Sequence, residues 1–255
     1  MAQRRSTTTE IEPGPGWQLI VTGALVFVGC DVQSAPPPST EHPYAPASVG
    51  DVWEYAMPQS HPAVQVPTTR STDRIVAAER RGERLVARVR SDFQGGTSER
   101  DMVISQLGVT PEIGSMTSAA GEVTTRVAEG VYLPRELSPG MRWEWRQELD
   151  TPVSSMAVFG RCAVVGEDGF RGQTAVHVRC ETQTRMITTL KTGFAVPPVE
   201  HVQHEDNYYV RGLGLVRSVT TMAQGYRAEK LLIRWQVAGA PAFVEETPTI
   251  AVGDP

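Results

Sequence analysis

Across residues 47–238, polar and apolar side chains alternate, and glycines that favour turns recur every ~8–12 residues. Alternation with a period of two places successive side chains on opposite faces of an extended chain, as in a strand buried on one face. Short alternating segments separated by turns are typical of antiparallel meanders. The sequence therefore predicts an all-β fold of antiparallel meanders.

A short motif of glycine, tryptophan, glutamate and an aromatic residue occurs twice. Residues 50–55 read GDVWEY, and residues 140–145 read GMRWEW. Residues 86–90 (VARVR) are matched in the same way by residues 175–179 (AVHVR), at nearly the same offset. Two matches at one offset predict a tandem duplication, although chance similarity of short segments remains the alternative. The two predicted curved-sheet or partial-barrel units cover residues 47–137 and 138–238.

Each predicted unit contains a segment that favours a β-hairpin. Residues 73–91 are rich in good helix formers, so one helix is the alternative there. Gly82 would cost that helix about 1 kcal/mol, and the alternation that follows Gly82 favours two strands. In the second unit, strands at residues 163–165 and 174–178 flank a glycine-rich turn at residues 166–172.

Cys162 and Cys180 lie symmetrically about the predicted second turn. Paired strands would place them opposite each other, near the ~5.5 Å Cα separation that a disulfide requires. Closing that loop would stabilise the fold by about 3 kcal/mol on the entropic model. A disulfide is therefore predicted, with two buried free thiols as the alternative. Metal binding is disfavoured, because no C-x-x-C spacing is present.

The N-terminal segment has the pattern of an export signal. Arg4 and Arg5 precede an uncharged, mostly apolar run at residues 19–29. In a helix this run reaches roughly 16 Å, about half of a ~30 Å hydrocarbon core, so it does not comfortably span a bilayer. The pattern predicts a signal peptide over residues 1–29. A buried strand that holds a structural cysteine is the alternative.

The apolar run ends in Val28-Gly29-Cys30-Asp31, which resembles the lipobox of bacterial lipoproteins. The resemblance implies that Cys30 becomes the mature N-terminus and carries a thioether-linked diacylglycerol and an amide-linked acyl chain. Phe27 departs from this pattern, since the family prefers leucine there. An aspartate after the lipidated cysteine resembles the inner-membrane retention signal of enteric bacteria, which leaves inner versus outer membrane undecided.

Lipidation at Cys30 would place the protein in the bacterial cell envelope, facing the periplasm or the exterior. Two or more acyl chains anchor a protein stably, so the membrane is the expected partner. The Pro/Ser-rich residues 30–46 are predicted to form a semi-rigid linker. Residues 239–255 have no periodic pattern and are predicted to form a disordered tail.

A closing motif of the second unit, Y-x-x-G-x-G-L-V at residues 209–216, adds a second resemblance. Together with the tryptophan motif, it resembles a loose group of bacterial exported proteins and lipoproteins of uncharacterised function. That resemblance covers about residues 138–235 and implies an antiparallel curved sheet or partial barrel. The first unit keeps only a degraded closing motif at residues 106–109.

The net charge of −5 gives the chain no basic excess for wrapping nucleic acid, so no nucleic-acid partner is expected. The sequence has no G-x-S-x-G, P-loop, H-E-x-x-H or dinucleotide-binding glycine motif. We therefore expect neither enzymatic activity nor a cofactor.

One polar cluster, at residues 201–206, contains two histidines and two carboxylates. His201, His204, Glu205 and Asp206 are residue types that bind zinc and other divalent ions. On a strand, however, His201 and His204 would point to opposite faces. The favoured interpretation is a solvated loop leading into a strand at Tyr208, and a metal site remains the weaker hypothesis.

The sequence thus predicts an envelope lipoprotein with a non-enzymatic binding or scaffolding role and an unknown envelope protein as partner. The first alternative is a carrier or sensor of apolar ligands such as lipids, in a half-open β-barrel. The second alternative is a metal-dependent hydrolase centred on His201 and His204. The aromatic residues that would line the cavity of a carrier are Trp53, Tyr55, Trp143, Trp145 and Trp235.

Overall fold

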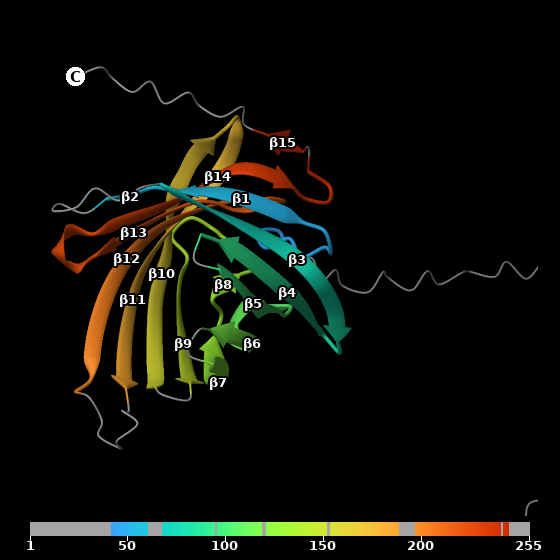
Figure 1. The fold of residues 1–255 in the computed structure, drawn as a ribbon. Helices are drawn as coiled ribbons and strands as arrows, with labels where there is room; N and C mark the ends of the chain where they lie inside the picture. The colour runs from blue at the N-terminus through green and yellow to red at the C-terminus, as the bar shows by residue number, and fades with distance from the viewer. Residues whose placement is uncertain are drawn as a thin grey trace, which may run out of the picture. The chain divides into compact units, whose positions relative to one another are not determined.

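The computed structural model describes residues 42–60, 68–94, 96–118, 121–151, 154–188, 197–240 and 242–244. In this part of the chain a single antiparallel sheet of 15 strands contains most of the residues (Figure 1). The predicted all-β, antiparallel, curved-sheet fold is therefore confirmed. No helix among these residues is long and apolar enough to cross a membrane.

The described part of the chain contains fifteen strands and one short 3-10 turn. In chain order they are β1 (Val52–Met57), β2 (Gln59–Ser60), β3 (Thr69–Arg81), β4 (Arg84–Phe93), β5 (Gly96–Ile104), β6 (Gly108–Ser118), β7 (Gly121–Gly130), β8 (Leu133–Pro134), β9 (Arg142–Thr151), β10 (Ser154–Phe170), β11 (Gln173–Thr188), β12 (Val199–Val210), β13 (Gly214–Met222), the 3-10 turn η1 (Ala223–Gly225), β14 (Arg227–Gln236) and β15 (Phe243–Val244).

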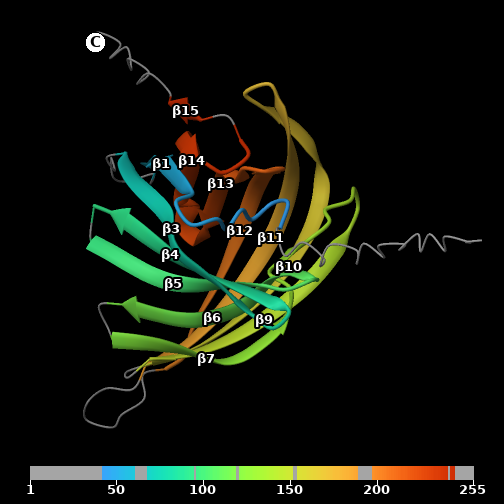
Figure 2. The same ribbon diagram turned by 90° about the vertical axis from the view of Figure 1, so that its right-hand side faces the viewer.

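The long strands of the two halves have the same order. Strands β1, β3, β4, β5, β6 and β7 lie side by side in chain order, and so do strands β9 to β14. Strand β7 pairs with β9, and β14 pairs with β1, so each half ends beside the first strand of the other half. The sheet curves strongly, and β3 to β7 face β10 to β13 across its concave side (Figure 2). Both halves therefore belong to one continuous sheet.

The two tryptophan motifs begin with the same backbone hydrogen bonds. The Gly50 N–H donates to the Ile75 carbonyl at 2.9 Å, and the Ile75 N–H donates to the Asp51 carbonyl at 3.0 Å. Val164 is bonded in the same way to residues 140–141, at 3.1 and 2.9 Å. A β-bulge follows both Ile75 and Val164 in their hairpins. The local geometry of the two motifs is thus the same.

Both predicted hairpins are present. Strands β3 and β4 flank a two-residue turn in which Gly82 has a φ of 61°, so the helix alternative for residues 73–91 is wrong. In the second hairpin the turn is confined to residues 171–172, and the longer turn expected at residues 166–172 is wrong. The bulge after Val164 absorbs one residue, which lets residues 166–170 continue the strand.

The core consists of buried side chains in two clusters. One cluster surrounds Trp145 and the cysteine pair, and the other surrounds Trp53 and Trp235. Trp145 packs on Gly160 so closely that a Cβ there would lie 2.2 Å from the indole Nε1. Each half of the chain thus supplies large aromatic anchors to the core.

The last residues of the predicted linker at residues 30–46 pack on the sheet instead. His42 and Tyr44 are 3% and 6% exposed, and the Gly212 N–H donates to the Pro43 carbonyl at 2.7 Å. Burial of the imidazole and phenol rings fixes residues 42–46 on the sheet, so they do not form a spacer. Residues 1–41, with the predicted signal peptide and Cys30, lie outside the described residues.

Part of the segment predicted to be a disordered tail, residues 239–255, forms a strand, β15. β13 pairs with β14 only as far as Leu231, which leaves the β14 backbone beyond it without that neighbour. Strand β15 occupies this place and pairs with Arg234 and Trp235. An unpaired strand edge offers ready hydrogen-bonding groups, which accounts for the added strand. Residues 245–255 lie outside the described part.

Candidate functional site

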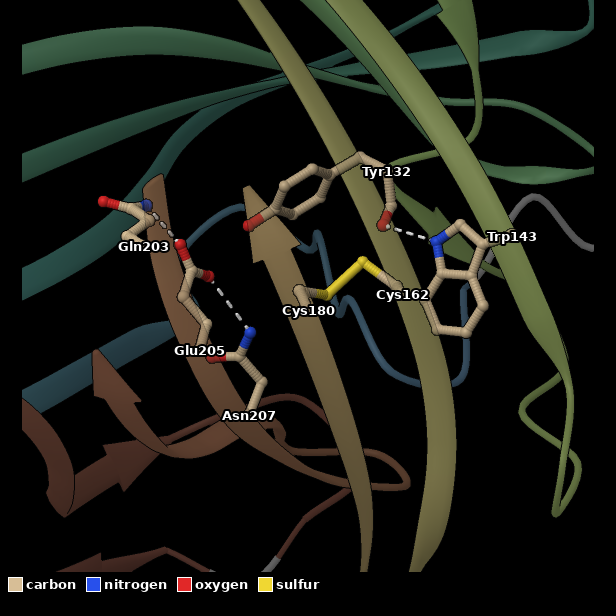
Figure 3. Close-up of a disulfide and its surroundings, with 7 residues drawn as sticks. All are labelled: Tyr132, Trp143, Cys162, Cys180, Gln203, Glu205 and Asn207. Atoms are coloured by element: carbon tan, nitrogen blue, oxygen red, sulfur yellow. Dashed lines mark hydrogen bonds between the residues drawn. A yellow bond between two sulfur atoms is a disulfide. The ribbon is translucent and has the colours of Figure 1, made fainter. Parts of the chain in front are cut away.

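The predicted disulfide between Cys162 and Cys180 is confirmed. The two residues are directly opposite in β10 and β11, with a Cα–Cα distance of 4.1 Å. Figure 3 shows Trp143 on one side of the bond, with the Tyr132 carbonyl next to Trp143 and the Tyr132 ring pointing away from it. The Trp143 indole donates to the Tyr132 carbonyl at 3.2 Å. The disulfide therefore fixes two long central strands beneath the concave face.

The polar cluster at residues 201–206 lies within β12 and not in a loop, so the expected solvated loop is wrong. Its backbone pairs with β11 throughout and with β13 from Gln203 onward. His201 and His204 fall on opposite faces of this strand, as the alternation predicted. No group of three or more histidine, cysteine, aspartate or glutamate residues that could hold a metal occurs among the described residues.

The two carboxylates of the cluster also face opposite ways and bind other protein groups. Glu205 accepts hydrogen bonds from Gln203 and Asn207 on its own strand (Figure 3). Asp206 accepts from His177 at 2.7 Å and from Arg179 at 3.0 Å. Burial opposes ionisation of Asp206, but these two donors outweigh burial and hold the pKa of the carboxyl below its ordinary value. The predicted metal candidates thus do not converge on one point.

A cavity of about 180 Å³ lies on the concave side of the sheet. Its walls combine aromatic rings, aliphatic side chains and three charged groups from both halves of the chain. The aromatic residues that line it are Tyr44, Trp53, Tyr55, Tyr132 and Tyr209. Apolar, concave surfaces with a few polar groups are the usual form of a small-molecule site. This cavity is therefore the candidate functional site.

The two sequence motifs meet at this cavity. The Trp53 indole donates to the Leu213 carbonyl at 2.7 Å, and the Tyr55 hydroxyl donates to the Leu215 carbonyl at 3.1 Å. Trp53 and Tyr55 belong to the first tryptophan motif, while Leu213 and Leu215 belong to the closing motif. These bonds fix the aromatic rings of β1 against the bend between β12 and β13. The motifs therefore build one wall of the cavity.

Three charged side chains line the cavity. The Lys230 ammonium lies 2.8 Å from Asp73 Oδ2 and 4.0 Å from the centre of the Tyr55 ring. Burial opposes the charge of Asp73, but Lys230, with smaller contributions from Ser91 and Arg100, holds the pKa of the carboxyl below its ordinary value. Among the described residues, the Arg100 side chain has no hydrogen bond, close ion pair or ring contact.

The buried tyrosines of the cavity are neutral at physiological pH. Burial raises the pKa of both Tyr55 and Tyr209 well above the ordinary value of 10.0. The Tyr55 hydroxyl donates a hydrogen bond to the Leu215 carbonyl, whereas the Tyr209 hydroxyl has no hydrogen-bond partner in the described part of the chain. Tyr209 therefore offers a neutral hydroxyl on the cavity wall.

Sequence reasoning identified part of this lining. Of the five expected aromatic residues, Trp53 and Tyr55 line the cavity. Trp145 and Trp235 are core residues outside it, and Trp143 packs against the core without lining the cavity. The charged lining residues and the tyrosines at 132 and 209 were not singled out. A signal for Asp73 existed, because Asp73 shares the face of β3 that Ile75 buries. A charged residue on a buried face is a common mark of a functional position.

Comparisons with known proteins give a likeness of fold. No family model matches the chain, and no curated protein matches its sequence. One solved structure is of a protein from Bacteroides fragilis NCTC 9343 that is described as exported, with a YMCC-like fold. Its sequence is 11% identical and its TM-score is 0.45; the match covers 76% of this chain and 98% of that chain. A second, of a protein described as a lipoprotein from Parabacteroides distasonis ATCC 8503, is 7% identical, with a TM-score of 0.45, and covers 77% and 99%.

Proposed function

We propose that this protein is a non-enzymatic binding protein of the bacterial cell envelope that holds a small, partly apolar ligand on the concave face of its sheet. The observation that carries the proposal is the cavity walled by Trp53, Tyr55, Tyr132 and Tyr209. Aromatic rings supply a large apolar contact area at low cost in conformational entropy. Binding is therefore the role that the geometry supports best.

The size of the cavity limits the ligand. Pockets for drug-sized ligands have volumes of roughly 300–1,000 Å³, and a cavity of about 150 Å³ is enough for benzene. At about 180 Å³ the cavity fits a ring or a short alkyl chain, and a whole lipid is too large. The proposal therefore narrows the apolar-carrier alternative to small amphiphiles or to one end of a larger molecule.

Native mass spectrometry of the full chain carrying Cys30→Ser tests the binding proposal. We expect a small bound molecule after purification without detergent. Met102→Trp fills the cavity that Met102 lines, so this variant is expected to lose the adduct. Val202→Trp, at an exposed position of β12, is the matched control and is expected to retain the adduct. Persistence of the adduct in Met102→Trp would exclude the cavity as the site.

Anchoring through Cys30 is the second element of the proposal. It is supported by the positively charged start, the apolar run at residues 19–29 and the cysteine that follows it. Acyl chains on Cys30 would hold the sheet near a membrane and near envelope partners. Cell fractionation tests this element: Cys30→Ser is expected to move the protein from the membrane to the soluble fraction. Unchanged membrane association would contradict lipidation at Cys30.

We also propose that the two halves arose by duplication. The matched hydrogen bonds at residues 50–51 and 140–141 support this origin, and so do the matched bulges after Ile75 and Val164. The identical order of six long strands in each half supports it further. The cavity has no such symmetry, because its charged groups occur in β3, β5 and β14. A duplicated scaffold would thus have acquired its site in one place.

A further inference from the structure

The charged side chains that line the cavity have more positive than negative charge. Asp73 and Lys230 form an ion pair at 2.8 Å, and their side chains are 11% and 26% exposed, so their charges largely compensate each other. Arg100 lines the same cavity but is solvent-exposed, which places it toward the open side. The Arg100 side chain makes no hydrogen bond or close ion pair among the described residues, although its charge helps to keep Asp73 ionised. With two cations and one carboxylate, the lining therefore has an excess of one positive charge.

An arginine in this position is suited to bind an anion. Its planar guanidinium presents five N–H donors in a fork that matches the oxygen atoms of carboxylates and phosphates. Because Arg100 is solvent-exposed, it can bind the head group of a molecule whose apolar part enters the cavity. The unpartnered hydroxyl of Tyr209 adds a neutral donor on the wall of the same cavity.

We infer that the ligand is an anionic amphiphile, whose terminal carboxylate or phosphate binds Arg100 while its apolar body lies among Trp53, Tyr55 and Tyr209. This inference rests on the proposed binding function and adds the chemical class of the ligand. A cationic amphiphile is disfavoured, because Arg100 and Lys230 would repel it and the single carboxylate is already paired. A purely apolar ligand would leave the arginine without a partner.

Isothermal titration calorimetry with four probes of equal chain length tests the inference on the full chain carrying Cys30→Ser. The probes are octanoate, octyl phosphate, octanol and octylamine. A hydrogen bond to a charged group is stronger than one between neutral groups, so at least one of the two anions is expected to bind about tenfold tighter than octanol. Octylamine is expected to bind most weakly. The stronger of the two anions identifies the head group, carboxylate or phosphate.

Two arginine variants test whether Arg100 causes the preference for an anionic probe. Arg100→Gln is expected to lower the affinity for the preferred anion to that for octanol and to leave the octanol affinity unchanged. Arg90→Gln is the matched control, because Arg90 lies on the neighbouring strand outside the cavity and pairs with Asp92 at 3.2 Å. That variant is expected to keep the anion preference. The comparison among probes on the chain with native Arg100 does not depend on how either variant folds.

The outcomes separate this inference from the proposed function. Equal binding of octanol and both anions would overturn the anionic class but support an apolar binding site. Binding of none of the four probes would overturn the proposed function itself. Tighter binding of octylamine would overturn the inference, and so would an anion preference that survives Arg100→Gln.

Discussion

Acidification is expected to destabilise this protein through one buried imidazole, that of His42. The His42 ring is 3% exposed, and both of its nitrogens are occupied. Nδ1 accepts a hydrogen bond from the Tyr44 N–H at 3.1 Å, so Nε2 carries the proton and donates to the Leu133 carbonyl at 3.2 Å. A proton added at Nδ1 would face the Tyr44 N–H and break that bond. The structure therefore holds His42 in its neutral form.

The size of the effect follows from the pKa. Burial is the main reason that the pKa of His42 falls from 6.5 to about 4. Between pH 6.5 and pH 4, His42 is protonated in the unfolded chain but neutral in the folded chain. The free energy of unfolding therefore decreases as the pH falls through this range, and His42 does not affect it at higher pH. At 1.36 kcal/mol for each pKa unit, the loss is about 3 kcal/mol when the pH reaches 4 or less.

Urea unfolding followed by tryptophan fluorescence, at pH 7.5 and pH 4, measures this loss. His42→Gln is the matched variant, because a glutamine side chain can both donate to the Leu133 carbonyl and accept from the Tyr44 N–H without titrating. Carboxylates that also titrate contribute equally to both proteins and cancel in the comparison. The native chain is expected to lose about 3 kcal/mol more than the variant. Equal losses in the two proteins would refute the reasoning.

Two further substitutions test the packing of the second half. Gly160→Ala is expected to destabilise the fold by about 1–3 kcal/mol in urea unfolding, because its Cβ would lie 2.2 Å from the Trp145 indole. Gly169→Ala, where a Cβ meets no atom within 4 Å, is the control, and equal midpoints for the two variants would contradict the prediction. Replacing both Cys162 and Cys180 with serine is expected to cost about 3 kcal/mol in the same assay, and an unchanged midpoint would argue against it.

Local patterns were sufficient to predict the strands and the cysteine pairing. Alternation identified the hairpin of β3 and β4 even though its residues favour helices, because Gly82 interrupts any helix there. The symmetry of Cys162 and Cys180 about a turn placed them opposite each other, as the structure has them. Both predictions depended only on residues near in sequence, which is why they succeeded.

The remaining features depend on contacts between distant segments. Residues 201–206 look polar enough for a loop, but pairing with β11 and β13 keeps them extended. Asp73 and Lys230, which form the ion pair of the cavity, come from strands at opposite ends of the chain. Only the pairing of β1 with both β3 and β14 brings those strands near each other. No local pattern reports that pairing, so the cavity was not predictable from sequence.

The pairing of β1 with β14 also determines when the site can exist during folding. Trp53 of β1 lies opposite Trp235 of β14, so the hydrogen bonds between these strands form only after β14 has been synthesised. Contacts between such remote segments are slow to form, because a long loop must close before they stabilise anything. Trp53 and Tyr55 come from the start of the chain and Lys230 from near its end. A nascent or truncated chain that lacks β14 therefore lacks the complete cavity. Ligand binding would thus distinguish the fully folded protein from such shorter chains.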